Sequence, residues 1–263
     1  ARSHRSNLRS TVTSLRTHNW GDPDRPALLL VHGLTEAGTA WPHAVERWSP
    51  TWHVHAVDLR GHGGSPRFDT AAASRMLDTF VNDLVETLRA LGPATVIGHS
   101  LGGRVAAIAA TRAPDFVRAL VLEDPALTQG TVTPPGFADE QHTFLDRFDN
   151  PADAGREKVL MRRNTTWTDD EIDRWAECKP HVDRHMIDQL ELGQVNASDV
   201  FTELRCPTLV LYDAYGPFAK HSVPTSNPSV DVRYLDGVSH CIRRDDPTTY
   251  HAIVDPWLAN HGR

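Results

Sequence analysis

The chain has 263 residues, and 40% of them are hydrophobic. This share is enough to bury a core, which excludes a globally disordered chain, and the length suits one large α/β domain better than a small disulfide-stapled module. The formal net charge of −7 argues against a general nucleic-acid binder, because such proteins need excess positive charge to displace counterions.

The cysteines and the N-terminal region indicate the compartment. Cys178, Cys206 and Cys241 are odd in number and their spacings fit no zinc motif, so reduced thiols are expected. The first ten residues carry arginines without an apolar run behind them, and the run at residues 27–31 is far too short to span a membrane. We expect a cytoplasmic protein with no signal peptide and no membrane partner, and leave open whether a leader precedes Ala1.

Short apolar runs alternate along the chain with stretches whose apolar residues recur at helical spacing. The runs predict strands at residues 27–31, 52–58, 94–97, 117–123, 207–212 and 230–235. The helical spacing predicts helices at residues 77–91, 101–112 and 248–260, the last interrupted by Pro256. This alternation predicts an α/β fold with a mostly parallel central sheet and helices on both faces.

The segment from residue 126 to residue 204 breaks the alternation, because it has no convincing strand pattern and reads as several short helices. Thr168 and Glu171 have the spacing of a capping box, in which both side chains satisfy free N–H groups at the start of a helix. We expect residues 1–125 and 205–263 to form the core, and residues 126–204 to form a helical insertion over the sheet edge within the same domain.

The strongest chemical signal is the sequence GHSLG at residues 98–102. It follows an expected strand and opens an expected helix of small residues, which is the context of a strained strand-to-helix turn that lifts a serine above the sheet. Glycines flank the serine because side chains at those positions would collide with neighbouring backbone. The helix N-terminus also stabilises negative charge nearby. We therefore predict that Ser100 is a nucleophile.

A second glycine-containing stretch, His32-Gly33-Leu34, comes directly after the first expected strand. From this position the N–H of Leu34 can join the N–H of Leu101 in an oxyanion hole for a tetrahedral intermediate. We expect His32 to shape the loop and Gly33 to border the substrate. The sequence DLRGHGGS at residues 58–65 is expected to be a structural loop.

Three blocks, LLLVHGL, DLRGHGGS and GHSLGG, stand in the order found in the α/β-hydrolase fold superfamily, which the chain resembles from about residue 15 to residue 258. That superfamily carries a helical cap where residues 126–204 lie. The resemblance implies a serine enzyme of the esterase or lactonase branch, without cofactor or metal, whose general base follows the last strand. His240 fits that position.

The identity of the nucleophile narrows the chemistry. Haloalkane dehalogenases and epoxide hydrolases of this fold use an aspartate at the position of Ser100, because they form an alkyl-enzyme ester. A serine forms an acyl-enzyme instead, which points to esters, lactones, thioesters or amides.

The resemblance leaves two candidates for the acid that orients His240. Most members carry it after the penultimate strand, but there the sequence runs from Asp213 to Gly216, with glycine where the acid should be. Haloalkane dehalogenases and certain lactone hydrolases place it one strand earlier, and Asp124 matches their spacing from the nucleophile. We favour Asp124 over the alternative Asp213, and we expect Glu123 to point to the opposite face.

Aromatic residues of the helical insertion predict an apolar substrate of moderate size, with Trp167 and Trp175 in contact with it. His181 and His185 have the spacing of a metal-binding helix face, but no third ligand completes it, so no metal is expected. The sequence thus predicts hydrolysis of a carboxylic ester through an acyl-enzyme on Ser100, with a lactone as the leading special case.

Three alternatives stay open from the sequence. A C–C bond hydrolase and an acyltransferase or thioesterase would use the same three residues, whereas a ligand-binding receptor on this fold would hydrolyse slowly. Besides a small-molecule ester or lactone, no partner is expected, and a homodimer is left open.

Overall fold

The computed structural model describes residues 14–128, 133–221 and 225–263, and the N-terminal stretch used to judge a signal peptide lies outside them. Within these residues, seven strands form one sheet in the order β1-β3-β2-β4-β5-β6-β7. β1 runs antiparallel to β3, and every other pair of neighbours is parallel. The strands are β1 (Thr17–Trp20), β2 (Ala27–Val31), β3 (His53–Val57), β4 (Ala94–His99), β5 (Val117–Glu123), β6 (Thr208–Asp213) and β7 (Val230–Leu235).

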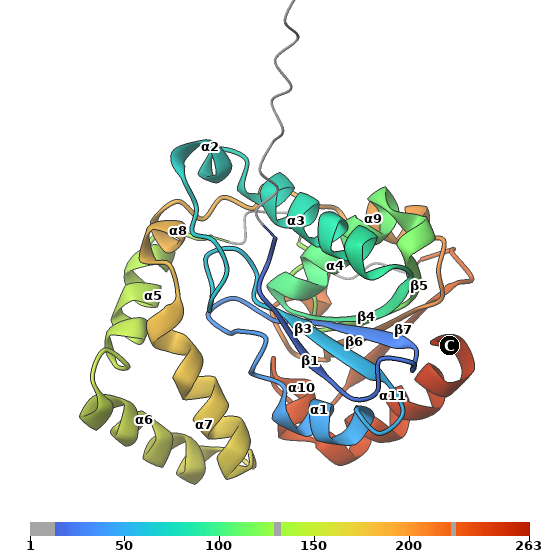
Figure 1. The fold of residues 1–263 in the computed structure, drawn as a ribbon. Coiled ribbons are helices and arrows are strands. Elements are labelled where there is room, and N and C mark those ends of the chain that lie inside the picture. Colours follow the sequence, from blue (N-terminus) through green and yellow to red (C-terminus); the bar gives the residue numbers. More distant parts are fainter. Residues whose placement is uncertain (1–13, 129–132, 222–224) are drawn as a thin grey trace, which may run out of the picture.

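Helices cover both faces of this sheet (Figure 1). β2 shows why: Leu29 and Val31 are buried in one apolar cluster with α3 and α4, while Leu28 and Leu30 are buried in another with α1 and α11. Alternate side chains of a strand point to opposite faces, so a strand covered on both sides is apolar throughout. The helices of this core are α1 (Pro42–Trp48), α2 (Thr70–Ala73), α3 (Met76–Leu91), α4 (Leu101–Arg112), α10 (Ile242–Asp245) and α11 (Pro247–His261).

The predicted α/β fold is confirmed, and all six predicted strands are present with bounds that differ by at most two residues. β1, α1, α2 and α10 were not predicted, because elements of four to seven residues are too short to show a periodicity. The predicted interruption at Pro256 is wrong, since α11 continues through it. Tyr250, Val254 and Leu258 pack on the same apolar cluster, which keeps both halves of the helix on one line despite the lost backbone donor.

We call residues 126–204 the helical segment. Its described part contains no strand, and α5, α6, α7 and α8 lie beside the core (Figure 1). α9 instead packs against α4 and buries Val200 and Phe201 in the cluster that also contains α3. The helices of the segment are α5 (Phe137–Asp146), α6 (Pro151–Asn164), α7 (Asp169–Cys178), α8 (Arg184–Asp188) and α9 (Ala197–Glu203).

The capping box predicted at the start of α7 is half correct. The side chain of Thr168 accepts the N–H of Glu171 at 3.3 Å, as expected of an N-cap. The carboxylate of Glu171 does not complete the box. It is buried, and it accepts the Nε of Arg244 at 2.7 Å and the backbone N–H of His43 at 3.4 Å. A fixed guanidinium in a buried site is a stronger partner for a carboxylate than an exposed helix end.

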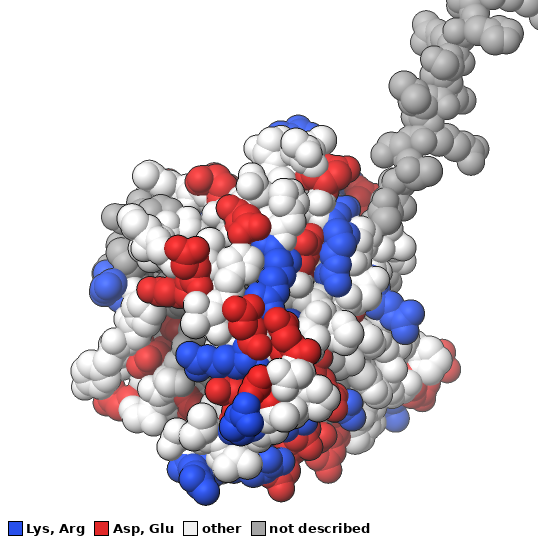
Figure 2. Space-filling model, turned by 90° about the vertical axis from the view of Figure 1, so that its left-hand side faces the viewer, with Lys and Arg blue, Asp and Glu red and all other residues white. Residues whose placement is uncertain are grey.

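The surface on the side of the helical segment carries positive and negative side chains next to one another, without a continuous patch of either sign (Figure 2). Ion pairs within the segment contribute to this mixture, among them Arg162–Asp169 and Arg184–Asp149. None of the helices in the described ranges combines the length and apolar character needed to cross a bilayer.

The packing of α4 on the sheet gives a stability prediction. A methyl group at Gly102 would overlap the carbonyl oxygens of Val31 and His32, which cannot move without distorting the end of β2. We expect Gly102→Ala to lower the free energy of unfolding by about 1–3 kcal/mol or more, measured by urea denaturation. Gly155→Ala is the matched control, because a methyl group in that helix meets no atom; it should stabilise by about 0.5–1 kcal/mol. Equal stability of the two variants would contradict the prediction.

Candidate active site

Ser100 lies at the sharp turn between β4 and α4, where the sequence predicted it. Its backbone angles are φ 53° and ψ −116°, which a residue with a side chain adopts only under strain. The surrounding chain holds the turn: the N–H of Ser100 donates to the carbonyl of Glu123 at 3.0 Å, and its own carbonyl accepts the N–H groups of Arg104 and Ala126 at 3.0 and 3.1 Å. Only about 9% of the residue is exposed.

Among the described residues, backbone strain of this kind occurs at one edge of the sheet. In the described ranges, the non-glycine residues with positive φ are Thr35 (63°), Ser100 (53°) and Asp124 (38°). They follow β2, β4 and β5, which are neighbours in the parallel part of the sheet, so all three lie beyond the carboxyl ends of adjacent strands. Strained backbone persists only where the surroundings enforce it, and such positions cluster at functional sites.

Asp124 and His240 meet at this edge. The Nδ1 atom of His240 lies 2.6 Å from Oδ2 of Asp124, and the carboxylate is fully buried while 38% of the histidine side chain is exposed. An ionised carboxylate only accepts hydrogen bonds, so Nδ1 carries the proton and Nε2 is left as the basic nitrogen. The second oxygen of Asp124 accepts the backbone N–H of Asp213 at 3.3 Å.

Asp213, the alternative acid, is used differently. Its carboxylate accepts the N–H of Tyr215 at 3.0 Å and fills the space beside Gly216. Asp213 therefore supports Asp124 through its backbone, and its side chain stabilises the turn after β6. Glu123 points away from Asp124, as expected of strand alternation, and accepts the backbone N–H and Nη1 of Arg243 at 2.8 and 2.9 Å.

His99 connects His240 to the turn at Ser100. It precedes Ser100 in the chain, its Nε2 donates to the carbonyl of His240 at 2.9 Å, and the two imidazole rings lie 4.8 Å apart. The ring of Phe218 contacts His240 at 5.3 Å. His240 is thus held beside β4 by contacts to its backbone, its ring and its Nδ1.

The protonation of His99 gives a prediction about pH. Burial alone would lower its pKa, but the carboxylates of Glu123 and Glu36, together with Cys241, raise it to about 10. Because this folded-state pKa lies above the unfolded value, the charge stabilises the fold fully below about pH 6.5, and this contribution is lost as pH rises towards 10. The melting temperature of the wild type should therefore exceed that of His99→Gln most at pH 6, and the gap should narrow by pH 10. A difference in melting temperature that does not depend on pH would contradict this prediction.

The backbone donors expected to form the oxyanion hole lie at the same edge. Gly33 is adjacent to Ser100, since a methyl group on it would come within 3.1 Å of the serine Cβ. The N–H of Leu34 has no acceptor among the described residues, and Leu101 is the first residue of α4, whose leading N–H groups have no partner within the helix. The two donors are therefore available to an oxygen atom bound near Ser100.

His32 and His62 shape the loops, as expected for His32. Each accepts a backbone N–H through Nε2, His32 from Leu59 at 2.9 Å and His62 from Thr35 at 3.4 Å. Each donates from Nδ1 to a backbone carbonyl, at 2.7 Å to Gly33 and 3.0 Å to Arg60. Burial lowers the pKa of both histidines, so they are neutral, and their hydrogen bonds hold the two loops in place.

Of the two tryptophans predicted to contact substrate, Trp167 reaches α10, and Trp175 packs within the helical segment. Trp167 donates from Nε1 to Asp245 at 2.8 Å, and Trp175 packs edge-on against Phe148 and lies under the ammonium group of Lys179. Their contact with a substrate stays a prediction. His181 and His185, considered for a metal, do not share a helix: His181 belongs to a 3₁₀ turn, and His185 lies in α8.

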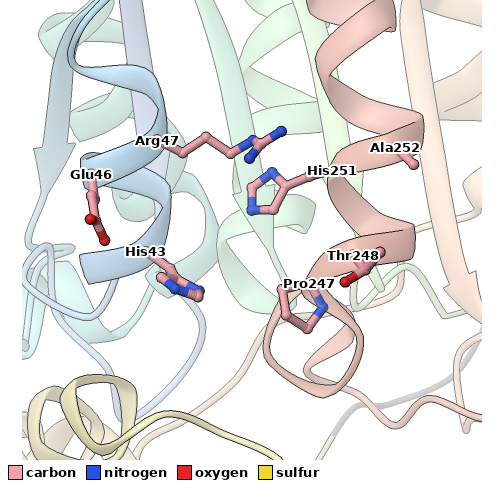
Figure 3. Close-up of a pocket in the computed structure, with 7 residues that line it drawn as sticks. All are labelled: His43, Glu46, Arg47, Pro247, Thr248, His251 and Ala252. Carbon is pink, nitrogen blue, oxygen red and sulfur yellow. The ribbon is translucent and has the colours of Figure 1, made fainter.

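A surface groove of about 580 Å³ lies between α1 and α11 (Figure 3). Arg47 and His251 extend into the space between these helices, and Arg47 is paired with Asp255 at 2.6 Å. The residues that line the groove are His43, Glu46, Arg47, Pro247, Thr248, His251 and Ala252. They include none of the candidate catalytic residues, so this groove is separate from the site at Ser100.

Sequence reasoning missed a group of buried charges beside the site. Glu36, Glu171, Lys179, Arg243 and Arg244 are each less than 5% exposed. Glu36 follows the predicted oxyanion loop and the two arginines follow His240, so proximity to the motifs was the available signal. A sequence does not reveal which charged residues are buried, because their partners lie far away in the chain.

Comparisons with known proteins identify the family of the chain. Residues 28–253 match the model of the alpha/beta hydrolase family. Lipase LipV of Mycobacterium tuberculosis is 33% identical over 183 residues, covering 67% of this chain and 63% of the lipase. N-formylmaleamate deformylase of Pseudomonas putida is 27% identical over 250 residues, covering 88% of each chain. The esterase RhEst1 from Rhodococcus sp. superposes with a TM-score of 0.70 at 19% identity, over 94% of each chain. The chain belongs to the alpha/beta hydrolase family.

Proposed function

We propose that the protein is a serine hydrolase that cleaves a carboxylic ester, with Ser100 as nucleophile, His240 as general base and Asp124 as the acid that orients it. One observation carries the proposal most strongly: the strained backbone of Ser100 lies at the sheet edge where buried Asp124 bonds the Nδ1 of His240. A hydroxyl is a weak nucleophile at neutral pH, and a histidine fixed in this tautomer is the group that activates it.

The proposed reaction has two halves. His240 Nε2 takes the hydroxyl proton as the Ser100 oxygen attacks the ester carbonyl carbon, and the N–H groups of Leu34 and Leu101 stabilise the oxyanion. When the intermediate collapses, the bond to the alkoxy oxygen breaks, and His240 returns the proton to the leaving alcohol. Water then attacks the acyl-enzyme with His240 as base, which releases the acid and restores Ser100.

The similarity to a lipase favours an ester, and the aromatic side chains of the helical segment favour an apolar acyl or alcohol group. A lactone is the special case suggested by an acid that follows β5. An amide is the second candidate, because the deformylase matches 88% of the chain. Both reactions pass through an acyl-enzyme. Cleavage of an amide also requires proton transfer to the amine, which is a poorer leaving group than an alcohol.

A substrate panel tests the proposal. Purified protein is incubated with p-nitrophenyl esters of increasing acyl length, simple lactones, a thioester and N-formyl amides, and acid release is followed. We expect turnover of at least one ester or lactone, with kcat/KM above that for the amides. Faster turnover of the amides would support the second candidate. Binding of a ligand without turnover of any class would overturn the proposal in favour of a receptor.

A further inference from the structure

A buried triad of charges links three elements around the candidate site. The guanidinium of Arg244 is fully buried and bonds two carboxylates, pairing through Nη1 with Glu36 and through Nε with Glu171 at 2.7 Å. Its third donor, Nη2, bonds the carbonyl of Ala40 at 2.9 Å. The flat face of the guanidinium lies over the ring of Trp167, 4.8 Å from its centre. Every nitrogen of this side chain is therefore fixed by a specific partner.

The partners come from the segments that the proposed reaction needs. Glu36 belongs to the loop after β2, two residues beyond Leu34, and Arg244 follows His240 by four residues in α10. Glu171 lies in α7 of the helical segment. A single guanidinium thus connects the loop of the proposed oxyanion donor, the loop of the proposed base and the helical segment. Lys179 adds a second tie, since its Nζ donates to the carbonyl of strained Thr35 at 2.9 Å.

The pair formed by Glu36 and Arg244 is charged in the folded protein. Burial alone would raise the pKa of Glu36, but the guanidinium of Arg244, together with His99 and Arg243, holds this pKa well below the usual value. The free energy needed to remove two charged groups from water is nearly as large as the free energy gained from their attraction. A buried ion pair is therefore weak evidence for stability. A guanidinium is planar, and its N–H donors point in fixed directions. When it binds two carboxylates, it therefore fixes the positions of those carboxylates relative to each other.

We infer that Arg244 is a positioning residue, which uses Glu36 to hold the oxyanion loop at a fixed distance from the loop of His240. This rests on the proposed function, since it assigns a role in that reaction. The Glu171 arm of the same guanidinium holds α7, which carries Trp175, against the core. The two ion pairs of Arg244 therefore have different consequences. The pair with Glu36 affects the stabilisation of the transition state, and the pair with Glu171 affects the binding of substrate.

Glu36→Gln and Glu171→Gln form a pair of variants, because each removes one carboxylate charge from Arg244 and keeps the shape of the side chain. Glu36 also faces His99 at 3.7 Å and Arg243 at 3.8 Å, so Arg244→Lys, which leaves those two contacts in place, is measured beside them. With the best ester of the panel, we expect Glu36→Gln to lower kcat about 10- to 100-fold with KM nearly unchanged. We expect Glu171→Gln to raise KM and to keep kcat within about threefold. Equal effects of the two variants on kcat, or no effect of Glu36→Gln, would overturn the inference.

One further measurement and the variant Arg244→Lys distinguish failure of this inference from failure of the proposed function. The rate of labelling by a fluorophosphonate reports nucleophile and oxyanion stabilisation without a leaving alcohol, and it should fall with kcat in Glu36→Gln. If the wild type is neither labelled nor active, the proposed function fails; if it is labelled at Ser100 and Glu36→Gln is labelled equally fast, the inference alone fails. Should Glu36→Gln not fold, Arg244→Lys replaces it, because lysine keeps the charge without the planar guanidinium. That variant should show the same loss of kcat, and an unchanged kcat would overturn the inference.

Discussion

Ser100→Ala is expected to lower kcat for ester hydrolysis by a factor of about 10⁴ or more, because it removes the oxygen proposed to attack the ester carbonyl. The substitution removes one oxygen atom and keeps the Cβ, so KM should change little. Steady-state kinetics with the best p-nitrophenyl ester measure both constants. Full activity of this variant would rule out the proposed mechanism.

Ser100→Gly is the companion variant, because it removes the same oxygen together with the cause of the backbone strain. At φ 53° a glycine has no Cβ to clash with the neighbouring backbone. We expect Ser100→Gly to be as inactive as Ser100→Ala and to be more stable than it by about 1 kcal/mol, measured by urea denaturation. If the alanine variant were the more stable one, the strain at this turn would not be a cost of function.

Asp124→Asn should lower kcat by about 10³- to 10⁴-fold, whereas Asp213→Asn should lower it by no more than about tenfold. An asparagine at position 124 can present its amide to Nδ1 of His240 and favour the wrong tautomer, and it cannot stabilise the imidazolium that forms when His240 takes the proton. An asparagine at position 213 keeps the oxygen that accepts the N–H of Tyr215.

These two isosteric variants also control for each other, since both remove a buried charge at the carboxyl end of neighbouring strands β5 and β6. Comparing kcat at one pH with circular dichroism of both proteins separates loss of chemistry from loss of folding. A larger effect of Asp213→Asn would transfer the role of the acid to Asp213.

The fold could be predicted from the sequence because it depends on local signals. Strands covered on both faces must be largely apolar, so β2, β4 and β6 could be located from short apolar runs. The turn at Ser100 was equally local, since a serine between glycines after a buried strand has few structural solutions. Elements without such a signal were missed: β1 has the sequence THNW, and it joins the sheet only by pairing with β3.

The sequence alone could not decide whether Asp124 or Asp213 contacts His240. Spacing favoured Asp124, and only the three-dimensional structure shows its carboxylate against Nδ1 of His240 while Asp213 serves its own turn. The positive φ of Thr35 and Asp124 could not have been predicted either, because the surrounding structure imposes such angles and no local sequence pattern marks them.

The sequence by itself determined the α/β architecture, the position of Ser100 and the histidine after the last strand, because these follow from periodicity and from motifs a few residues long. Only the tertiary structure decided where Glu36, Glu171 and Arg244 meet and which direction the Glu171 side chain takes. Glu171 has the spacing of a helix cap, and its carboxylate bonds instead a guanidinium 73 residues away. Burial and the pairing of distant charges are properties of the assembled core, which a local pattern in the chain does not contain.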